Sequence, residues 1–93
     1  LADRLQASST LNDYTAKNDA LGKLAADAAE AGNAKIAGEA LQQMVDFTAR
    51  SQVGLGVVRE LAKRGMRKPA LEIAKTITDF TIRDQALSEL AGK

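Results

Sequence analysis

Apolar side chains recur every three or four residues along most of this chain, which is the spacing that places them on one face of an α-helix. Residues 34–44 show it clearly, with Ile36, Ala37, Ala40, Leu41 and Met44 separated mostly by polar side chains. The same pattern runs through residues 1–11 and about 14–31, and it returns in the later parts of the chain. The pattern predicts six helical segments and therefore an all-α fold.

A three-residue phrase stands at the points where the helical pattern restarts. It occurs as Asp13-Tyr14-Thr15, Asp46-Phe47-Thr48 and Asp79-Phe80-Thr81, with successive copies 33 residues apart. Each aspartate can accept a hydrogen bond from the free amide groups of a helix's first turn, and Thr15 is a second candidate for the first of these caps. A repeat of this length with helical periodicity is typical of stacked helical hairpins, so we predict an α-solenoid of antiparallel helix pairs.

The repeat divides the chain into units inside one predicted domain, residues 1–93. We expect complete units at 12–44 and 45–77, a partial unit at 78–93, and a remnant of a preceding unit at 1–11. The remnant corresponds to the second helix of a hairpin, so we expect the chain to be part of a longer repeat protein.

Turn residues support this division. Gly32 and Gly65 fall where each complete hairpin turns and where a left-handed backbone is needed. Asn33 suits either the exit of one helix or the cap of the next. Pro69 falls in the first turn of a helix, where its missing N–H costs nothing.

Composition removes several classes of chemistry. The chain has no cysteine and no histidine, which excludes disulfides, thiolate metal sites and the commonest general base. Its net charge of +1 is too small to indicate nucleic acid or a membrane surface as a partner. No apolar run approaches the roughly 20 residues of a membrane helix. We therefore expect no enzyme activity, no cofactor and no metal.

The repeated phrase also suggests two packing roles. A base follows each aspartate four positions later, at Lys17, Arg50 and Arg83, and we expect an ion pair at each place. The aromatic residue of each phrase is expected to fill the space between hairpins; these residues are Tyr14, Phe47 and Phe80.

Two other features have alternative explanations. Gly54 and Gly56 resemble part of a phosphate-binding loop, but they fall inside a predicted helix, so close helix contact or a kink is the favoured explanation. A basic cluster surrounds the turn at Gly65, where it suits a helix C-terminus or, alternatively, an acidic peptide or phosphate. The cluster consists of Lys63, Arg64, Arg67 and Lys68.

Small residues at fixed places in the units resemble the tetratricopeptide repeat, whose period is 34 residues. Gly32 and Gly65 match its mid-hairpin glycine, and Ala37 and Ala70 match its small residue in the second helix. Its Leu-Gly pair is matched by Leu24-Ala25, Val57-Val58 and Leu90-Ala91. The chain departs from the family at the early aromatic position and at the closing proline, and the family register starts the first helices near Lys17, Arg50 and Arg83.

The resemblance implies a protein- or peptide-binding module that uses a concave face of its first helices. The partner-binding residues that it implies are Asp19, Lys23, Gln52, Arg59, Lys63, Gln85, Ser88 and Glu89. The alternative is a structural role, in which the open ends of the stack join copies into a homo-oligomer or dock another domain.

Overall fold

The computed structural model describes residues 1–92, which form six α-helices joined by short turns. The helices are α1 (Ala2–Ser9), α2 (Tyr14–Glu30), α3 (Ala34–Gln43), α4 (Phe47–Lys63), α5 (Arg67–Lys75) and α6 (Phe80–Ala91). No strand occurs among these residues. The predicted all-α class is confirmed, and each of the six predicted helical segments contains one helix.

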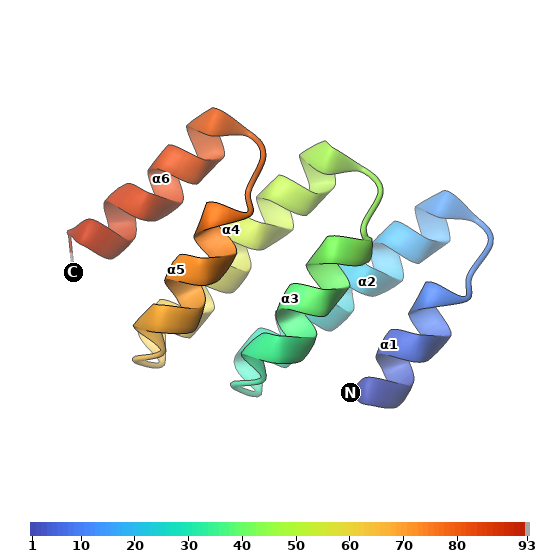
Figure 1. Cartoon of the computed structure of the whole chain (residues 1–93). Helices are drawn as coiled ribbons and strands as arrows, with labels where there is room; N and C mark the ends of the chain where they lie inside the picture. The colour runs from blue at the N-terminus through green and yellow to red at the C-terminus, as the bar shows by residue number, and fades with distance from the viewer. Residues whose placement is uncertain (93) are drawn as a thin grey trace.

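The helices lie in two layers, and consecutive helices run in opposite directions (Figure 1). The front layer consists of α1, α3 and α5, and the back layer consists of α2, α4 and α6. Neighbours within each layer contact one another, and each front helix also contacts the back helix that follows it. The molecule measures 40 × 25 × 14 Å, so it is thin across the two layers.

Each back-layer helix begins with the predicted aspartate cap. Asp13, Asp46 and Asp79 have extended backbones, and their carboxylates accept hydrogen bonds from the amides three residues later at 2.9, 3.0 and 3.0 Å. The carboxylate thereby satisfies an amide that has no partner inside the helix and places negative charge at the positive helix end. The first helices therefore start at the phrase itself, and the later start implied by the family register is wrong.

The turns between the two helices of each hairpin use a left-handed glycine. Gly32 and Gly65 have φ values of +74° and +81°. After Gly32, the Asn33 amide donates to the Ala28 carbonyl at 2.8 Å, and after Gly65, the Met66 amide donates to Leu61 at 2.9 Å. These bonds satisfy carbonyls at the ends of α2 and α4, as is typical of glycine-terminated helices.

The two turns then start the next helix differently. Asn33 caps α3 by accepting from the Ile36 amide at 3.1 Å. Met66 occupies the same place before α5 and has no side-chain cap. The residue that would need this cap is Pro69, which has no N–H group. The proline therefore removes the need for the bond that asparagine supplies in the first unit.

The core lies between the two layers and is built almost entirely from aliphatic side chains. Leu21, Leu24 and Leu61 are its largest fully buried side chains. Gly54 is buried in α4, and a Cβ there would lie 3.3 Å from Ile77 Cγ1. This glycine therefore allows close helix contact. The remaining buried apolar residues are Ala25, Ala28, Ala29, Ile36, Ala37, Ala40, Leu41, Met44, Leu55, Val57, Val58, Ala70, Ile73, Ala74, Ile77, Ala86 and Leu90.

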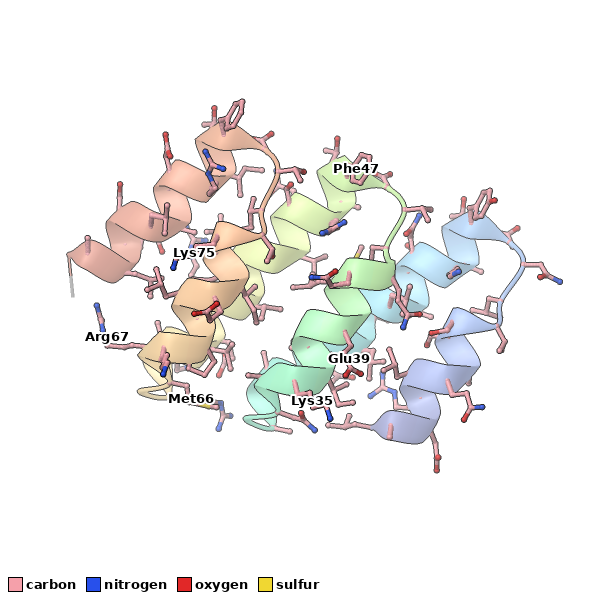
Figure 2. All side chains as sticks on the ribbon, viewed as in Figure 1. Lys35, Glu39, Phe47, Met66, Arg67 and Lys75 are labelled. Atoms are coloured by element: carbon pink, nitrogen blue, oxygen red, sulfur yellow. The ribbon has the colours of Figure 1, made fainter. Side chains whose placement is uncertain are left out.

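The aromatic residues do not fill the space between hairpins, so that prediction is wrong. Tyr14, Phe47 and Phe80 are 69%, 63% and 70% exposed. Each stands at the first position of its helix, and Phe47 points away from the helices in Figure 2. Side chains on a helix tilt towards its N-terminus, so a residue at this position extends beyond the packed layer.

The expected ion pairs between each aspartate and the base four residues later are also absent within residues 1–92. The carboxylates are hydrogen-bonded to backbone amides instead. The Arg50 guanidinium lies 6.0 Å from the centre of the Phe47 ring, and that of Arg83 lies 4.9 Å from the Phe80 ring. These arginines therefore cover exposed aromatic faces, a contact worth roughly 0.5–1 kcal/mol at the surface.

One side-chain hydrogen bond joins a back-layer helix to the linker that follows its hairpin. Asn18 in α2 accepts from the Val45 amide at 2.9 Å. The equivalent residue of α4, 33 positions later, is Ser51, which is 1% exposed. Its hydroxyl has no hydrogen-bond partner in the described part of the chain. The second unit therefore has a polar side chain at this position, but that side chain does not make the hydrogen bond to the linker that Asn18 makes in the first unit.

Candidate functional site

The candidate site is the surface of the three back-layer helices, which share one cap geometry and lie side by side (Figure 1). Of the eight predicted partner-binding residues, seven are exposed and Glu89 is half-buried. Asp19 and Lys23 are on α2, Gln52, Arg59 and Lys63 are on α4, and Gln85, Ser88 and Glu89 are on α6.

The structure divides these residues between two hollows instead of bringing all eight together. Asp19 and Lys23 line a hollow of about 510 Å³ between α1 and α2. A smaller hollow of about 100 Å³ between α4 and α6 is lined by Arg59, Lys63 and Glu89. Gln52 and Ser88 are exposed but line neither hollow. The eight predicted residues therefore do not form one continuous site.

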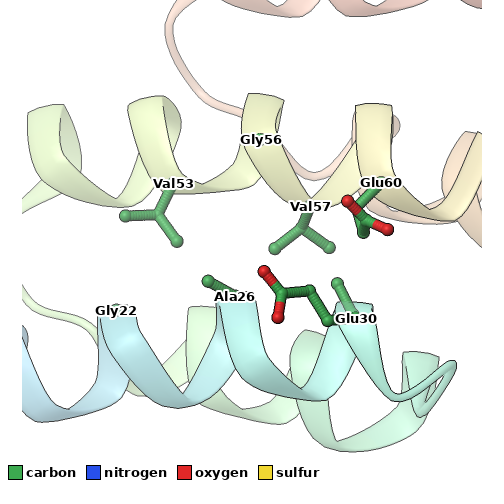
Figure 3. Close-up of a pocket in the computed structure, with 8 residues that line it drawn as sticks. Gly22, Ala26, Glu30, Val53, Gly56, Val57 and Glu60 are labelled. Carbon is green, nitrogen blue, oxygen red and sulfur yellow. The ribbon is translucent and has the colours of Figure 1, made fainter. Parts of the chain in front are cut away.

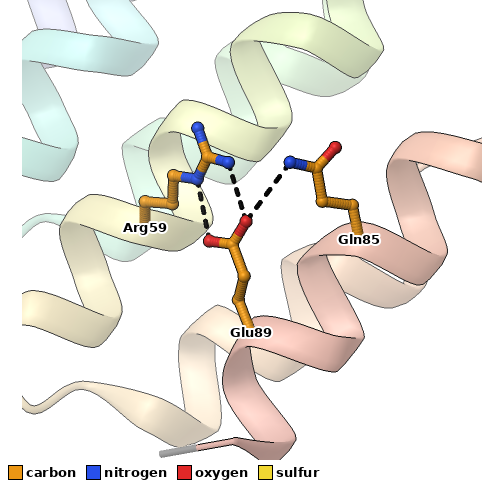
Figure 4. Close-up of polar contacts among 3 residues, drawn as sticks. All are labelled: Arg59, Gln85 and Glu89. Carbon is orange, nitrogen blue, oxygen red and sulfur yellow. Dashed lines mark hydrogen bonds and ion pairs between the residues drawn. The ribbon is translucent and has the colours of Figure 1, made fainter.

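Three of the predicted residues bind one another between α4 and α6 (Figure 4). Arg59 donates from Nε and Nη2 to the two carboxylate oxygens of Glu89, at 2.8 and 2.7 Å. Gln85 adds a longer bond to the same carboxylate at 3.4 Å. A two-point contact of this kind fixes orientation as well as distance.

The hydrogen bonds from Arg59 to Glu89 raise the pKa of the guanidinium above its ordinary value, and the charge of Glu89 acts in the same direction. Because the raised pKa belongs to a base, the Arg59–Glu89 pair contributes its full stabilisation of the fold at neutral pH. This stabilisation is lost only as the pH rises through the pKa that Arg59 has in the folded state. A partner that recognised Arg59 would have to compete with a carboxylate already in place.

A groove that was not predicted lies between α2 and α4 and has a volume of about 220 Å³. Small residues line it on both helices, with Gly22 and Ala26 on α2 and Gly56 on α4. Figure 3 shows Val53 and Val57 pointing from α4 towards α2. The lining of the groove is therefore apolar except at one end.

Two carboxylates stand at one end of this groove. Glu30 and Glu60 lie near the C-terminal ends of α2 and α4, and both line the groove. Glu60 accepts from Arg64 at 3.1 Å on its own helix. The sequence does indicate this groove, through small residues at helical spacing on the two helices. The groove was not predicted because polar residues were expected to form the site.

The two glycines of α4 have different surroundings. Gly54 is buried against Ile77, whereas Gly56 is exposed and nothing would lie within 4 Å of a Cβ there. They do not form one loop around a common space, so the geometry of a phosphate-binding loop is absent. Gly56 instead opens the groove between α2 and α4.

The basic cluster at the Gly65 turn is partly used in structural contacts. Arg64 pairs with Glu60, and Arg67 donates to the backbone carbonyl of Leu90 in α6. Lys63 and Lys68 are exposed. Arg67 therefore joins the start of α5 to the end of α6, Arg64 pairs within the end of α4, and the two lysines are left at the surface.

Comparison with protein families, curated proteins and solved structures gives no match for this chain. In the described residues, no group of three or more acidic side chains is arranged to hold a metal ion. None of the helices in residues 1–92 combines the length and apolar character of a membrane span.

Proposed function

We propose that this chain is a protein- or peptide-binding module, a tetratricopeptide-like α-solenoid whose partner lies across the back-layer helices. The supporting observation is the groove between α2 and α4, which is apolar, open to solvent and lined by residues from two adjacent units. A groove of this kind suits an extended or helical peptide, because it is already formed and binding requires little ordering. The proposed role is binding without chemistry.

The polar residues around the groove would supply specificity. Glu30 and Glu60 favour a basic side chain on the partner at one end of the groove. Lys63 is exposed further along the same helix layer, where a partner carboxylate would find positive charge, whereas Arg59 beside it is already paired with Glu89. The expected partner is therefore a peptide with an apolar centre and charges of both signs.

The test is selection of peptides from a random displayed library on the purified chain. Gly56→Gln is the decisive variant, because its side chain would fill the groove at an exposed position where nothing would lie within 4 Å of its Cβ. We expect at least tenfold weaker binding of the selected peptides and no loss of thermal stability. Lys63→Glu is expected to weaken the binding of selected peptides that carry an acidic residue.

Lys35→Glu is the matched control, since Lys35 is exposed on α3 in the other layer. This charge reversal is expected to leave binding unchanged. Selected peptides that bind Gly56→Gln as tightly as the original chain would refute the groove. A library from which no peptide is enriched over an unrelated protein would refute the module itself.

A further inference from the structure

The three aromatic side chains of the repeated phrase form an apolar row that neither the core nor the groove uses. Tyr14, Phe47 and Phe80 are the only aromatic residues of the chain, and they are 69%, 63% and 70% exposed. Each is the first residue of a back-layer helix, and these helices begin at the same end of their layer (Figure 1). The three rings therefore follow one side of the molecule, which we call the aromatic edge.

Basic side chains hold two of these rings at the surface. The guanidinium of Arg50 lies 6.0 Å from the centre of the Phe47 ring, and that of Arg83 lies 4.9 Å from the centre of the Phe80 ring. Both arginines are half-buried. The contact restricts the directions that each ring can take, so a partner that packs on the rings would cost little side-chain freedom.

The spacing of the rings matches one turn of a polyproline II helix. Packed α-helices lie about 8–10 Å apart, and α4 contacts both α2 and α6. Rings at the same position of successive back-layer helices are therefore separated by about this distance. A polyproline II helix has three residues per turn and a rise of about 3.1 Å per residue, so every third side chain returns to the same face after about 9 Å.

A hydroxyl group beside each ring suits the backbone of such a helix. Thr15, Thr48 and Thr81 directly follow the aromatic residues, and all three are exposed. A polyproline II helix has no internal hydrogen bonds, so its carbonyl groups need donors from outside. A threonine hydroxyl can act as that donor once per turn. Each unit therefore presents an apolar ring and a donor together.

The charge of the aromatic edge favours a neutral partner. Each phrase contains one aspartate, and one base follows it four residues later, so these groups together have no net charge. Nucleic acids and anionic membranes are bound largely through an excess of positive charge, which the edge lacks. Proline-rich segments instead dock on aromatic side chains through apolar contact, and their preformed conformation keeps the ordering cost low.

We propose that the aromatic edge binds a proline-rich segment of another protein, in the polyproline II conformation and with a proline at every third position. Successive prolines pack against Tyr14, Phe47 and Phe80, and the neighbouring threonine hydroxyls donate to backbone carbonyls of the segment. This site is separate from the groove between α2 and α4, because no residue that lines the groove belongs to the phrases. The two sites therefore bind different peptides.

The test compares two labelled twelve-residue peptides of proline, alanine and serine by fluorescence anisotropy. They have the same composition, but their three prolines are three residues apart in the first and four residues apart in the second. The second spacing turns successive prolines to different sides of the helix. We expect the first peptide to bind about tenfold more tightly, because only its prolines can contact all three rings together.

Variants of the central ring test the same contact from the side of the protein. Phe47→Ser should weaken binding of the first peptide about tenfold, whereas Phe47→Tyr keeps a ring and should retain binding. Circular dichroism should show unchanged helix content in both variants, since the ring is exposed. Leu71→Ser is the matched control, because it removes an exposed apolar side chain from α5 in the other layer. Binding by this control should be unchanged.

Equal binding of the two peptides, or no binding of either, would overturn the proposal, as would full binding by Phe47→Ser. Gly56→Gln should leave binding of the first peptide unchanged; a loss would place that peptide in the groove and overturn the assignment to the edge. A labelled thymidine oligonucleotide and vesicles of anionic lipid are measured alongside. Binding of either that disappears in Phe47→Ser would assign the aromatic edge to that ligand instead.

Discussion

Replacing Gly56 with alanine tests how much the glycines of α4 cost the fold. Gly56 lies in the interior of a 17-residue helix, is exposed, and would have no atom within 4 Å of an added Cβ. Alanine is favoured over glycine in a helix interior by about 0.8–1.0 kcal/mol, mainly because glycine loses more backbone freedom on folding. We expect Gly56→Ala to raise the free energy of unfolding by about 1 kcal/mol.

Gly54 provides the comparison, because it lies two residues earlier in the same helix and differs in its surroundings. A Cβ at Gly54 would lie 3.3 Å from Ile77 Cγ1 and 3.5 Å from Cδ1, and Ile77 is buried. The gain in helix propensity is then opposed by overpacking, which typically costs about 1–3 kcal/mol. We expect Gly54→Ala to be neutral or destabilising by up to about 2 kcal/mol.

Urea unfolding followed by circular dichroism measures both changes, with the dependence on urea concentration checked for equality. For a chain of this size, 1 kcal/mol corresponds to about 4–8 °C in Tm. If Gly54→Ala stabilises the chain as much as Gly56→Ala does, close packing against Ile77 is not the reason for the glycine. If Gly56→Ala gives no gain, the backbone argument fails.

Three further substitutions test other parts of the fold by the same urea measurement. Asp46→Ala removes the cap of α4 and should cost about 1 kcal/mol, whereas Asp46→Asn keeps an acceptor and should cost less; equal losses would point to charge alone. Phe80→Ala should cost less than about 1 kcal/mol, since the ring is exposed and touches Arg83, and a loss of about 3–5 kcal/mol would mean that the ring is buried after all. Ser51→Ala should stabilise the chain by about 1 kcal/mol, because it removes a buried hydroxyl without a partner; destabilisation would reveal a hydrogen bond made by that hydroxyl.

Features that depend on neighbouring residues could be predicted from the sequence. Asp46 caps α4 through an amide three positions later, and Gly65 forms a turn with its own neighbours. Such interactions have a fixed spacing along the chain, and the 33-residue repeat showed them more than once. The buried positions of α3 were likewise correct, because helical periodicity fixes which side chains share a face.

Features that depend on direction or on distant partners could not be predicted. Tyr14 and its counterparts were assigned to the interior because they are apolar and repeated, but a residue at the first position of a helix points beyond the layer. Arg59 and Glu89 were both placed on the candidate face, yet their pairing joins residues 30 positions apart. That contact depends on the rotation of α6 against α4, which sequence spacing alone does not determine.

Helix α3 starts with an asparagine cap, whereas α5 starts without a cap and has a proline in its first turn. This difference restricts which substitutions each unit tolerates. Asn33 is useful only while residue 36 has an amide to offer, and Pro69 is tolerated with Met66 because it has none. Replacing Pro69 with isoleucine would add a backbone N–H to the first turn of α5, and the Met66 side chain would not accept a hydrogen bond from it as Asn33 does from Ile36. Placing proline at position 36 would instead remove the N–H that donates to Asn33. The two positions of each unit therefore form an epistatic pair, in which the effect of one substitution depends on the residue present three positions away.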